Sequence, residues 1–380
     1  FYLLIMSVLA LRDGMRVAYQ EWGASSSSVK HILALHGWLD NSNSFKMLGP
    51  QLAAKGCHVI AIDIPGHGKS AHLGPDANYT TAKSVGYVNE IVDKLGWEKP
   101  HILGHSMGAG ISLAFAGTFP EKLEKLILIE GLGAVTAEPE ACARNLRKAI
   151  EAESKAAVRA ASFAAAAGGR DLGPGSGRVY PTFEDAVNAR INVVSTYPGE
   201  QTLSKEAATW LVGRGAYLIP TGTGTTTGSP MNTELPPAPP SSSSSTGSNT
   251  PPTTAGVPTG AGTGACITAA ALERDLEIGD GAVRFRYDPR LMLPTHVYLT
   301  SEQVASFCEG VTAQTLFVSA EKGWPLGARH QAAYEARVKL LKDDKGLMTH
   351  VHLPGSHHLH VDPATAPAVL NEISKFLELP

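Results

Sequence analysis

The sequence predicts an α/β protein with a mostly parallel, doubly wound sheet, and three observations support this fold class. Short apolar segments recur along the chain, and most are bounded by Gly, Pro or a charged residue, as in HILAL at 31–35 and VIAID at 59–63. These segments lack polar alternation, which indicates strands buried on both faces. Helical patterns separate them, and strand–helix alternation implies a parallel sheet.

The alternation is interrupted once, by residues 137–310, which we expect to form a helical cap because they lie between two predicted core strands. The core is then divided into residues 6–136 and 311–380. The predicted strands cover 7–11, 31–35, 59–63, 101–104, 126–129, 315–319 and 349–353. The predicted helices cover 42–55, 80–95, 107–119, 328–341 and 364–376 in the core and 138–166, 182–194, 204–214 and 301–309 in the cap.

A second insertion, residues 219–266, lies inside the predicted cap. Thr, Gly, Ser and Pro dominate its composition, and Glu234 is its only charged residue. Such a segment buries too little apolar surface to offset the entropy lost on ordering it. We therefore expect a disordered surface loop.

The composition excludes several classes of protein. The chain has 380 residues, of which 43% are hydrophobic and 18% charged, with a net charge of −3. It lacks the positive charge that binding to nucleic-acid phosphates requires.

Its first residues, FYLLIMSVLAL, form an apolar run too short to span a bilayer and without the basic start of a signal peptide. We expect an intracellular protein without stable membrane insertion, in the cytoplasm or in an organelle such as the peroxisome.

The strongest chemical signal is the segment Gly104-His105-Ser106-Met107-Gly108, which follows a predicted strand and begins a predicted helix. A G-x-S-x-G sequence in that setting is the pattern of a nucleophile elbow. The tight turn exposes the serine hydroxyl above a helix N-terminus, where backbone N–H groups favour developing negative charge. We therefore predict that Ser106 is a nucleophile.

A second loop at the same edge of the sheet contains His36, Gly37 and Trp38, after the strand predicted at 31–35. A backbone N–H in such a loop can point at the acyl oxygen of a substrate. We expect the N–H groups of Trp38 and Met107 to form an oxyanion hole.

Four motifs together resemble the α/β-hydrolase superfamily: HGW at 36–38, DIPGHGKS at 63–70, GHSMGAG at 104–110 and GSHHLH at 355–360. The segments HGWLDNSNSF, LIEGLG and FRYDPRL resemble the branch called serine hydrolase-like proteins. The resemblance implies the α/β-hydrolase fold with a helical cap. It makes DIPGHGKS a structural loop near the mouth of the active site. This segment is not a phosphate-binding loop, because Asp63 stands where that motif needs glycine.

The base is expected late in the chain, since this fold orders its residues as serine, acid and histidine. His357 follows the strand predicted at 349–353, and we favour it over His358 by the Gly-Ser-His spacing. A histidine-rich loop can also bind a metal ion, but no Asp, Glu or Cys pattern supports that. We expect no metal and no cofactor.

The acid has two candidates. Many members of the fold place an Asp after the strand predicted at 315–319, but here that position is Gly323, and Glu321 is two residues early. Glu130 follows the strand predicted at 126–129 and is the alternative that the serine hydrolase-like branch implies. We favour Glu130, which only has to orient the histidine ring.

These residues predict a serine hydrolase that cleaves an ester, thioester or amide of a small molecule through an acyl-enzyme. A carbon–carbon bond hydrolase uses the same groups and stays an alternative. A ligand receptor or scaffold of the same fold is the non-catalytic alternative. We expect a fairly apolar substrate, because Trp210, Tyr217 and Phe307 would form the roof of an apolar pocket.

Overall fold

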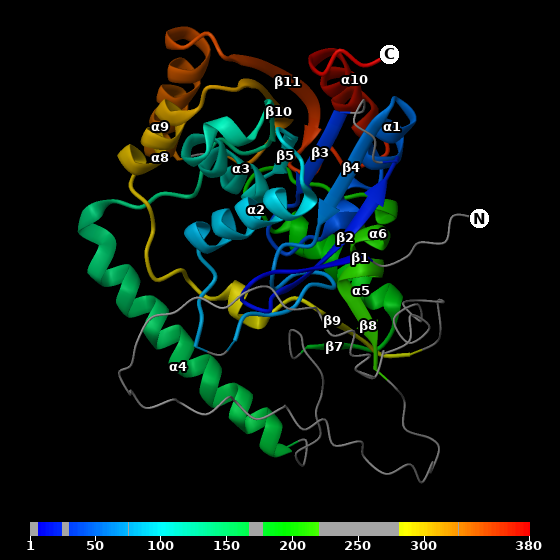
Figure 1. Cartoon of the computed structure of the whole chain (residues 1–380). Helices are drawn as coiled ribbons and strands as arrows, with labels where there is room; N and C mark the ends of the chain where they lie inside the picture. The colour runs from blue at the N-terminus through cyan, green and yellow to red at the C-terminus, as the bar shows by residue number, and fades with distance from the viewer. Residues whose placement is uncertain (1–6, 25–29, 75, 167–177, 220–280, 326) are drawn as a thin grey trace, which may run out of the picture.

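The computed structural model describes residues 7–24, 30–74, 76–166, 178–219, 281–325 and 327–380. Its centre is an eight-stranded sheet with the order β1-β2-β4-β3-β5-β6-β10-β11 (Figure 1). The six strands from β4 to β11 pair in parallel, whereas β1 and β2 are antiparallel additions at one edge. The expected α/β architecture, a mostly parallel sheet covered by helices, is confirmed.

The strands of this sheet are β1 (Ser7–Ala10), β2 (Arg16–Trp22), β3 (Lys30–Leu35), β4 (Cys57–Ile62), β5 (His101–His105), β6 (Lys125–Ile129), β10 (Gln314–Lys322) and β11 (Met348–Ser356). The helices beside it are α1 (Leu48–Ala54), α2 (Thr81–Leu95), α3 (Met107–Thr118), α8 (Ser301–Gly310), α9 (Ala328–Lys339) and α10 (Ala366–Phe376).

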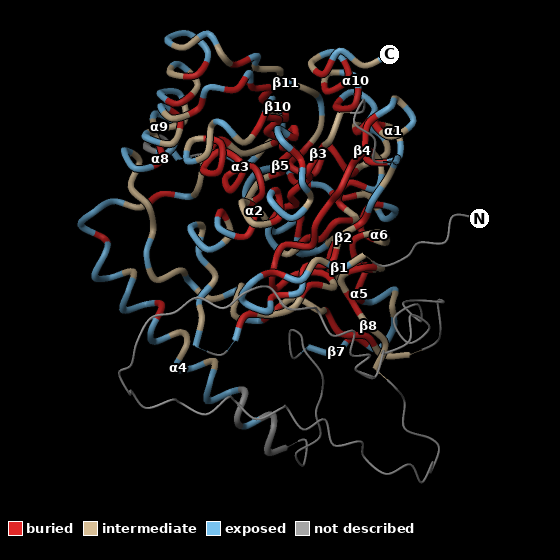
Figure 2. Tube along the Cα trace, viewed as in Figure 1, coloured by how far each residue is buried: buried red, intermediate tan, exposed pale blue. Residues whose placement is uncertain are grey.

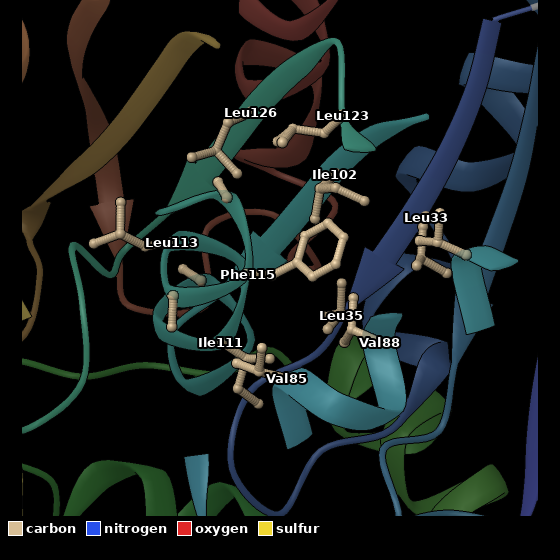
Figure 3. Packing of buried hydrophobic residues seen from close by; sticks show 14 of the residues in the cluster. Leu33, Leu35, Val85, Val88, Ile102, Ile111, Leu113, Phe115, Leu123 and Leu126 are labelled. Carbon is tan, nitrogen blue, oxygen red and sulfur yellow. The ribbon is translucent and has the colours of Figure 1, made fainter. Parts of the chain in front are cut away.

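Helices cover both faces of the sheet, and successive side chains of a strand point to opposite faces, so both sets of side chains are buried. In β3, Leu33 and Leu35 pack with α2 and α3, around Phe115 (Figure 3). Ile32 and Ala34 of the same strand belong to the cluster on the other face, with α1 and α10. This explains the continuous apolar runs in the sequence, since each face buries every second residue.

The cap contains α5 (Phe183–Ser195), α6 (Lys205–Gly215) and a small antiparallel sheet of β7 (Val179–Tyr180), β9 (Val283–Phe285) and β8 (Ala216–Leu218). It has an apolar core of its own, which includes Val187, Leu211 and Phe285. The long helix α4 (Cys142–Ala166) projects away from the sheet (Figure 1) and is mostly exposed along its described side chains (Figure 2).

The sequence missed β2 and the small cap sheet. β2, RVAYQEW, mixes charged and apolar residues, and the cap strands are only two or three residues long. Most of the insertion at 219–266 lies outside the described residues. Helix α8, assigned to the cap from sequence, packs against α3 of the core. The division at 136/137 and 310/311 stays a prediction.

No helix in the described part of the chain combines the length and the apolar character that crossing a bilayer requires.

Candidate active site

Ser106 stands at the turn between β5 and α3 with φ of 51° and ψ of −113°, outside the regions that a non-glycine residue normally adopts. The turn is this tight because α3 begins directly against β3. A Cβ on Gly108 would lie 2.1 Å from the carbonyl oxygen of Leu35 and 2.6 Å from that of His36. Only glycine fits at that position, and the helix start is thereby fixed beside the end of β3.

His357 follows β11 and points at this serine. Its Nε2 lies 2.8 Å from Ser106 Oγ, within hydrogen-bond distance for a hydroxyl that donates to the imidazole. The side chain of His357 is almost fully buried. The other candidate, His358, lies with its Nε2 3.6 Å from Asp40 Oδ2 and has no such contact with Ser106 among the described residues.

Glu130 is the carboxylate that the structure brings to the histidine. It follows β6 with φ of 53°, and its Oε2 lies 2.9 Å from Nδ1 of His357. Its Oε1 accepts a hydrogen bond from the N–H of Ala320 at 2.6 Å, and its Oε2 accepts one from the N–H of Trp324 at 3.3 Å. The carboxylate is nearly buried, so these donors replace the water that it loses.

The loop after β10 supplies space instead of an acid. A Cβ on Gly323 would lie 2.7 Å from each carboxylate oxygen of Glu130, so a side chain at 323 would compete with Glu130 for the same volume. Glu321 is exposed, and the contact with Nδ1 of His357 is made by Glu130.

The two expected oxyanion donors lie at the edge of the same site. Met107 is the first residue of α3, and the N–H groups in the first turn of a helix have no partner within it. The N–H of Trp38 makes no backbone hydrogen bond in the described part of the chain. Its loop lies against the first turn of α3, as the close approach of the His36 carbonyl to Gly108 indicates. Their role in binding an oxyanion stays a prediction.

Behind the serine lies a buried group of histidines. The ring of His105 lies 3.9 Å from that of His360, centroid to centroid, and its Nε2 donates a hydrogen bond to the carbonyl of His357 at 2.9 Å. Burial, together with His360, His357 and His358, holds the pKa of His105 well below its usual value. His105 is therefore neutral, and it braces the backbone of His357.

Two buried ion pairs join the cap to the core beside this site. Arg190 of α5 pairs with Asp40, and Nε of Arg214 in α6 donates to both carboxylate oxygens of Asp63, each at 2.9 Å. Burial alone would raise the pKa of Asp40, but Arg190 and His358 outweigh it and hold the pKa well below its usual value. These pairs fix the cap above the carboxyl edge of the sheet.

The DIPGHGKS segment folds around Asp63. Besides pairing with Arg214, the carboxylate accepts hydrogen bonds from the N–H groups of Ser42 and Lys69, both at 2.8 Å. The residue that excludes a phosphate-binding loop is thus the centre of a structural turn. The sequence contains the motif but does not reveal Arg214, its partner in the cap.

The expected roof of the pocket is wrong in its residues. Phe307 packs on the core cluster around α3, and Trp210 packs in the apolar core of the cap. The ring centroid of Tyr217 lies 5.4 Å from the guanidinium carbon of Arg286. The aromatic ring beside the histidine is that of Trp324, whose centroid lies 5.5 Å from that of His357. Trp324 is 42% exposed, so part of its surface is free to contact a bound molecule.

Comparison with known proteins agrees with this fold. A family model described as alpha/beta hydrolase fold matches residues 30–165. A serine hydrolase-like protein of Danio rerio is 24% identical over 94% of this chain and 84% of its own length. A serine hydrolase-like protein of Dictyostelium discoideum is 40% identical over 127 residues, which are 33% of this chain but only 35% of that protein.

Among solved structures, a hypothetical protein of Pseudomonas aeruginosa PAO1 is similar over almost the whole chain. The comparison gives a TM-score of 0.68 and 28% identity, and it covers 99% of this chain and 100% of that one.

Proposed function

Because this chain belongs to the α/β-hydrolase superfamily, in its serine hydrolase-like branch, we propose that it is a serine hydrolase with Ser106 as nucleophile, His357 as base and Glu130 as acid. One observation carries this proposal. His357 lies within hydrogen-bond distance of Ser106 through one ring nitrogen and of Glu130 through the other. A base between a nucleophile and an orienting carboxylate is the arrangement that activates a serine hydroxyl.

In the first half of the reaction, Nε2 of His357 accepts the proton of Ser106 as Oγ forms a bond to the carbonyl carbon of the substrate. Glu130 keeps the proton of the imidazole on Nδ1, so that Nε2 is free to act as base, and it stabilises the imidazolium that forms. The N–H donors of Ala320 and Trp324 hold the carboxylate in place while this charge develops.

The tetrahedral intermediate carries its negative charge on the former carbonyl oxygen, which we propose is bound by the N–H groups of Trp38 and Met107. Collapse of this intermediate breaks the bond to the leaving group, which takes the proton from His357. Water then attacks the acyl-enzyme with His357 again as base, and the carboxylic acid and free Ser106 are released.

The substrate that we propose is a small ester, thioester or amide with a fairly apolar group. The exposed part of Trp324 beside the base supports this, because an apolar group bound next to His357 would cover that surface.

The test is hydrolysis of p-nitrophenyl esters of increasing acyl length by the parent protein and by Ser106→Ala. We expect turnover by the parent and a loss of roughly 10⁴-fold or more in the variant. Equal rates across the acyl series would contradict the apolar preference. One turnover followed by tight retention of product would favour a ligand receptor, and no turnover by either folded protein would contradict the proposed catalysis.

A further inference from the structure

The cap segment between α5 and α6 lies directly against the loop that carries His357. Thr202 accepts a hydrogen bond at its carbonyl from Ser356 Oγ at 2.9 Å, and the N–H of Ser204 donates to Asp362 Oδ2 at 3.1 Å. Gln201 lies in this segment and is buried, with 4% of its surface exposed. The cap segment thus contacts residues on both sides of His357 in the chain, Ser356 and Asp362.

Both polar atoms of the Gln201 side-chain amide, Oε1 and Nε2, make hydrogen bonds. Its Oε1 accepts a hydrogen bond from the N–H of His357 at 2.9 Å. Its Nε2 lies 3.0 Å from the carbonyl oxygen of Lys322, 3.1 Å from that of Gly323 and 3.1 Å from that of Pro198. One amide therefore connects the loop after β11, the loop after β10 and its own cap segment.

These two loops are the ones that hold the base and the acid. The loop after β11 carries His357, and the loop after β10 donates the N–H of Trp324 to the carboxylate of Glu130. We infer that Gln201 is a positioning residue of this site, which fixes the catalytic histidine relative to the carboxylate from the cap. This inference rests on the proposed function.

The backbone of His357 is held from two sides. Its carbonyl accepts the hydrogen bond of His105 from the core, and its N–H donates to Gln201 from the cap. Without Gln201, the N–H of His357 and the carbonyls of Lys322 and Gly323 lose a buried partner, and the two loops can separate. A displacement of about 1 Å in a catalytic group can lower the rate by roughly 100-fold.

Only an amide of this length can make these contacts. Methionine has the same reach but neither donates nor accepts well, and asparagine is one methylene shorter. Thr202 offers a matched control in the same segment, because its hydroxyl contacts Ser356 Oγ at 3.3 Å and neither His357 nor the loop after β10.

The experiment compares Gln201→Met and Thr202→Val in the full chain, with p-nitrophenyl esters as substrate. We expect Gln201→Met to lower kcat by roughly 10- to 100-fold with KM within about threefold of the parent value. The Thr202→Val variant should keep the parent kcat. Should Gln201→Met fail to fold, Gln201→Asn replaces it with the same expectation. A folded Gln201 variant with the parent kcat would overturn the inference.

Proton NMR supplies a readout independent of turnover. The Nδ1–H proton shared by His357 and Glu130 should give a downfield resonance that weakens or disappears in the Gln201 variant and persists in Thr202→Val. An unchanged resonance would overturn the inference even if kcat falls. Since the resonance requires no substrate, it tests the positioning role even if the parent hydrolyses nothing, which would contradict the proposed function alone.

Discussion

The loops after β6 and β10 follow neighbouring parallel strands, yet one contributes a carboxylate to the site and the other contributes backbone groups and space. The loop after β6 supplies the carboxylate of Glu130, from a residue with φ of 53°. The end of β10 and the loop after it supply two backbone N–H donors, those of Ala320 and Trp324, and Gly323 leaves the volume that this carboxylate occupies. The acid thus depends on two loops, one that carries it and one that makes room for it.

Removal of the negative charge from Glu130 and from Glu321, one at a time, shows which carboxylate orients His357. Glu130→Gln should lower kcat by roughly 10³- to 10⁴-fold, because an amide does not hold the imidazole in the required tautomer. Glu321→Gln, near the end of β10, is the matched control and should keep the parent kcat. A large loss in the Glu321 variant, with Glu130→Gln active, would place the acid after β10 and contradict the assignment.

A side chain at position 323 tests the space that the loop after β10 leaves for Glu130. Gly323→Ala puts a methyl group 2.7 Å from both oxygens of Glu130 and should lower kcat by roughly 10- to 100-fold, because the carboxylate has to move away from His357. Gly327→Ala on the same loop is the control, since a Cβ there meets nothing within 4 Å. Similar kcat values for the two variants would show that the volume at 323 does not matter.

A third loop, after β11, extends the comparison to pH. Burial, with the neighbouring His358, lowers the pKa of His360 to about 3 from its ordinary 6.5. Between pH 6.5 and 3 the unfolded state binds a proton on this histidine and the folded state does not. The free energy of unfolding is therefore highest above pH 6.5 and decreases as the pH falls toward 3. Between pH 6.5 and about 5 the loss is about 2 kcal/mol of unfolding free energy.

Urea unfolding at several pH values measures this loss, with His360→Gln as the reference. An amide does not titrate and can keep a hydrogen bond to Ser44 Oγ, which lies 2.8 Å from Nε2 of His360. The variant should lose less stability in acid than the parent. Equal losses in the two proteins would show that His360 is not the group responsible.

The smallest effect concerns the backbone of the loop after β6. Glu130→Gly and Glu130→Ala remove the same carboxylate, but only glycine adopts a positive φ without strain. The glycine variant should be more stable to urea by about 1 kcal/mol, and both should be nearly inactive. Equal stabilities would mean that Glu130 is not strained in solution.

The sequence predicted those parts of the fold that local patterns determine. The strands before Ser106 and Glu130 are continuous apolar runs, and the elbow has a fixed glycine spacing, so both were evident. β2 was missed because it lies near the sheet edge, where the burial of its residues is uneven. The expected roof was wrong because aromatic side chains of this region pack elsewhere, Trp210 in the apolar core of the cap and Phe307 against the core cluster around α3.

The acid and the bracing residues depend on tertiary contact. Glu130 follows β6 and Glu321 lies near the end of β10, and nothing in the local sequence says which carboxylate reaches His357. Gln201 lies in no motif, and its role depends on contact with two loops more than 100 residues away in the chain. Charged partners such as Asp40 and Arg190 are likewise joined only by the fold.

The most direct measurement of the central claim is to treat the folded protein with a fluorophosphonate and locate the adduct by peptide mass spectrometry. We expect one covalent adduct, on Ser106, and none in Ser106→Ala. We also expect much slower labelling of Glu130→Gln than of Glu321→Gln. An unlabelled parent, or an adduct on another residue, would contradict the claim that Ser106, His357 and Glu130 act together as an acyl-transfer site.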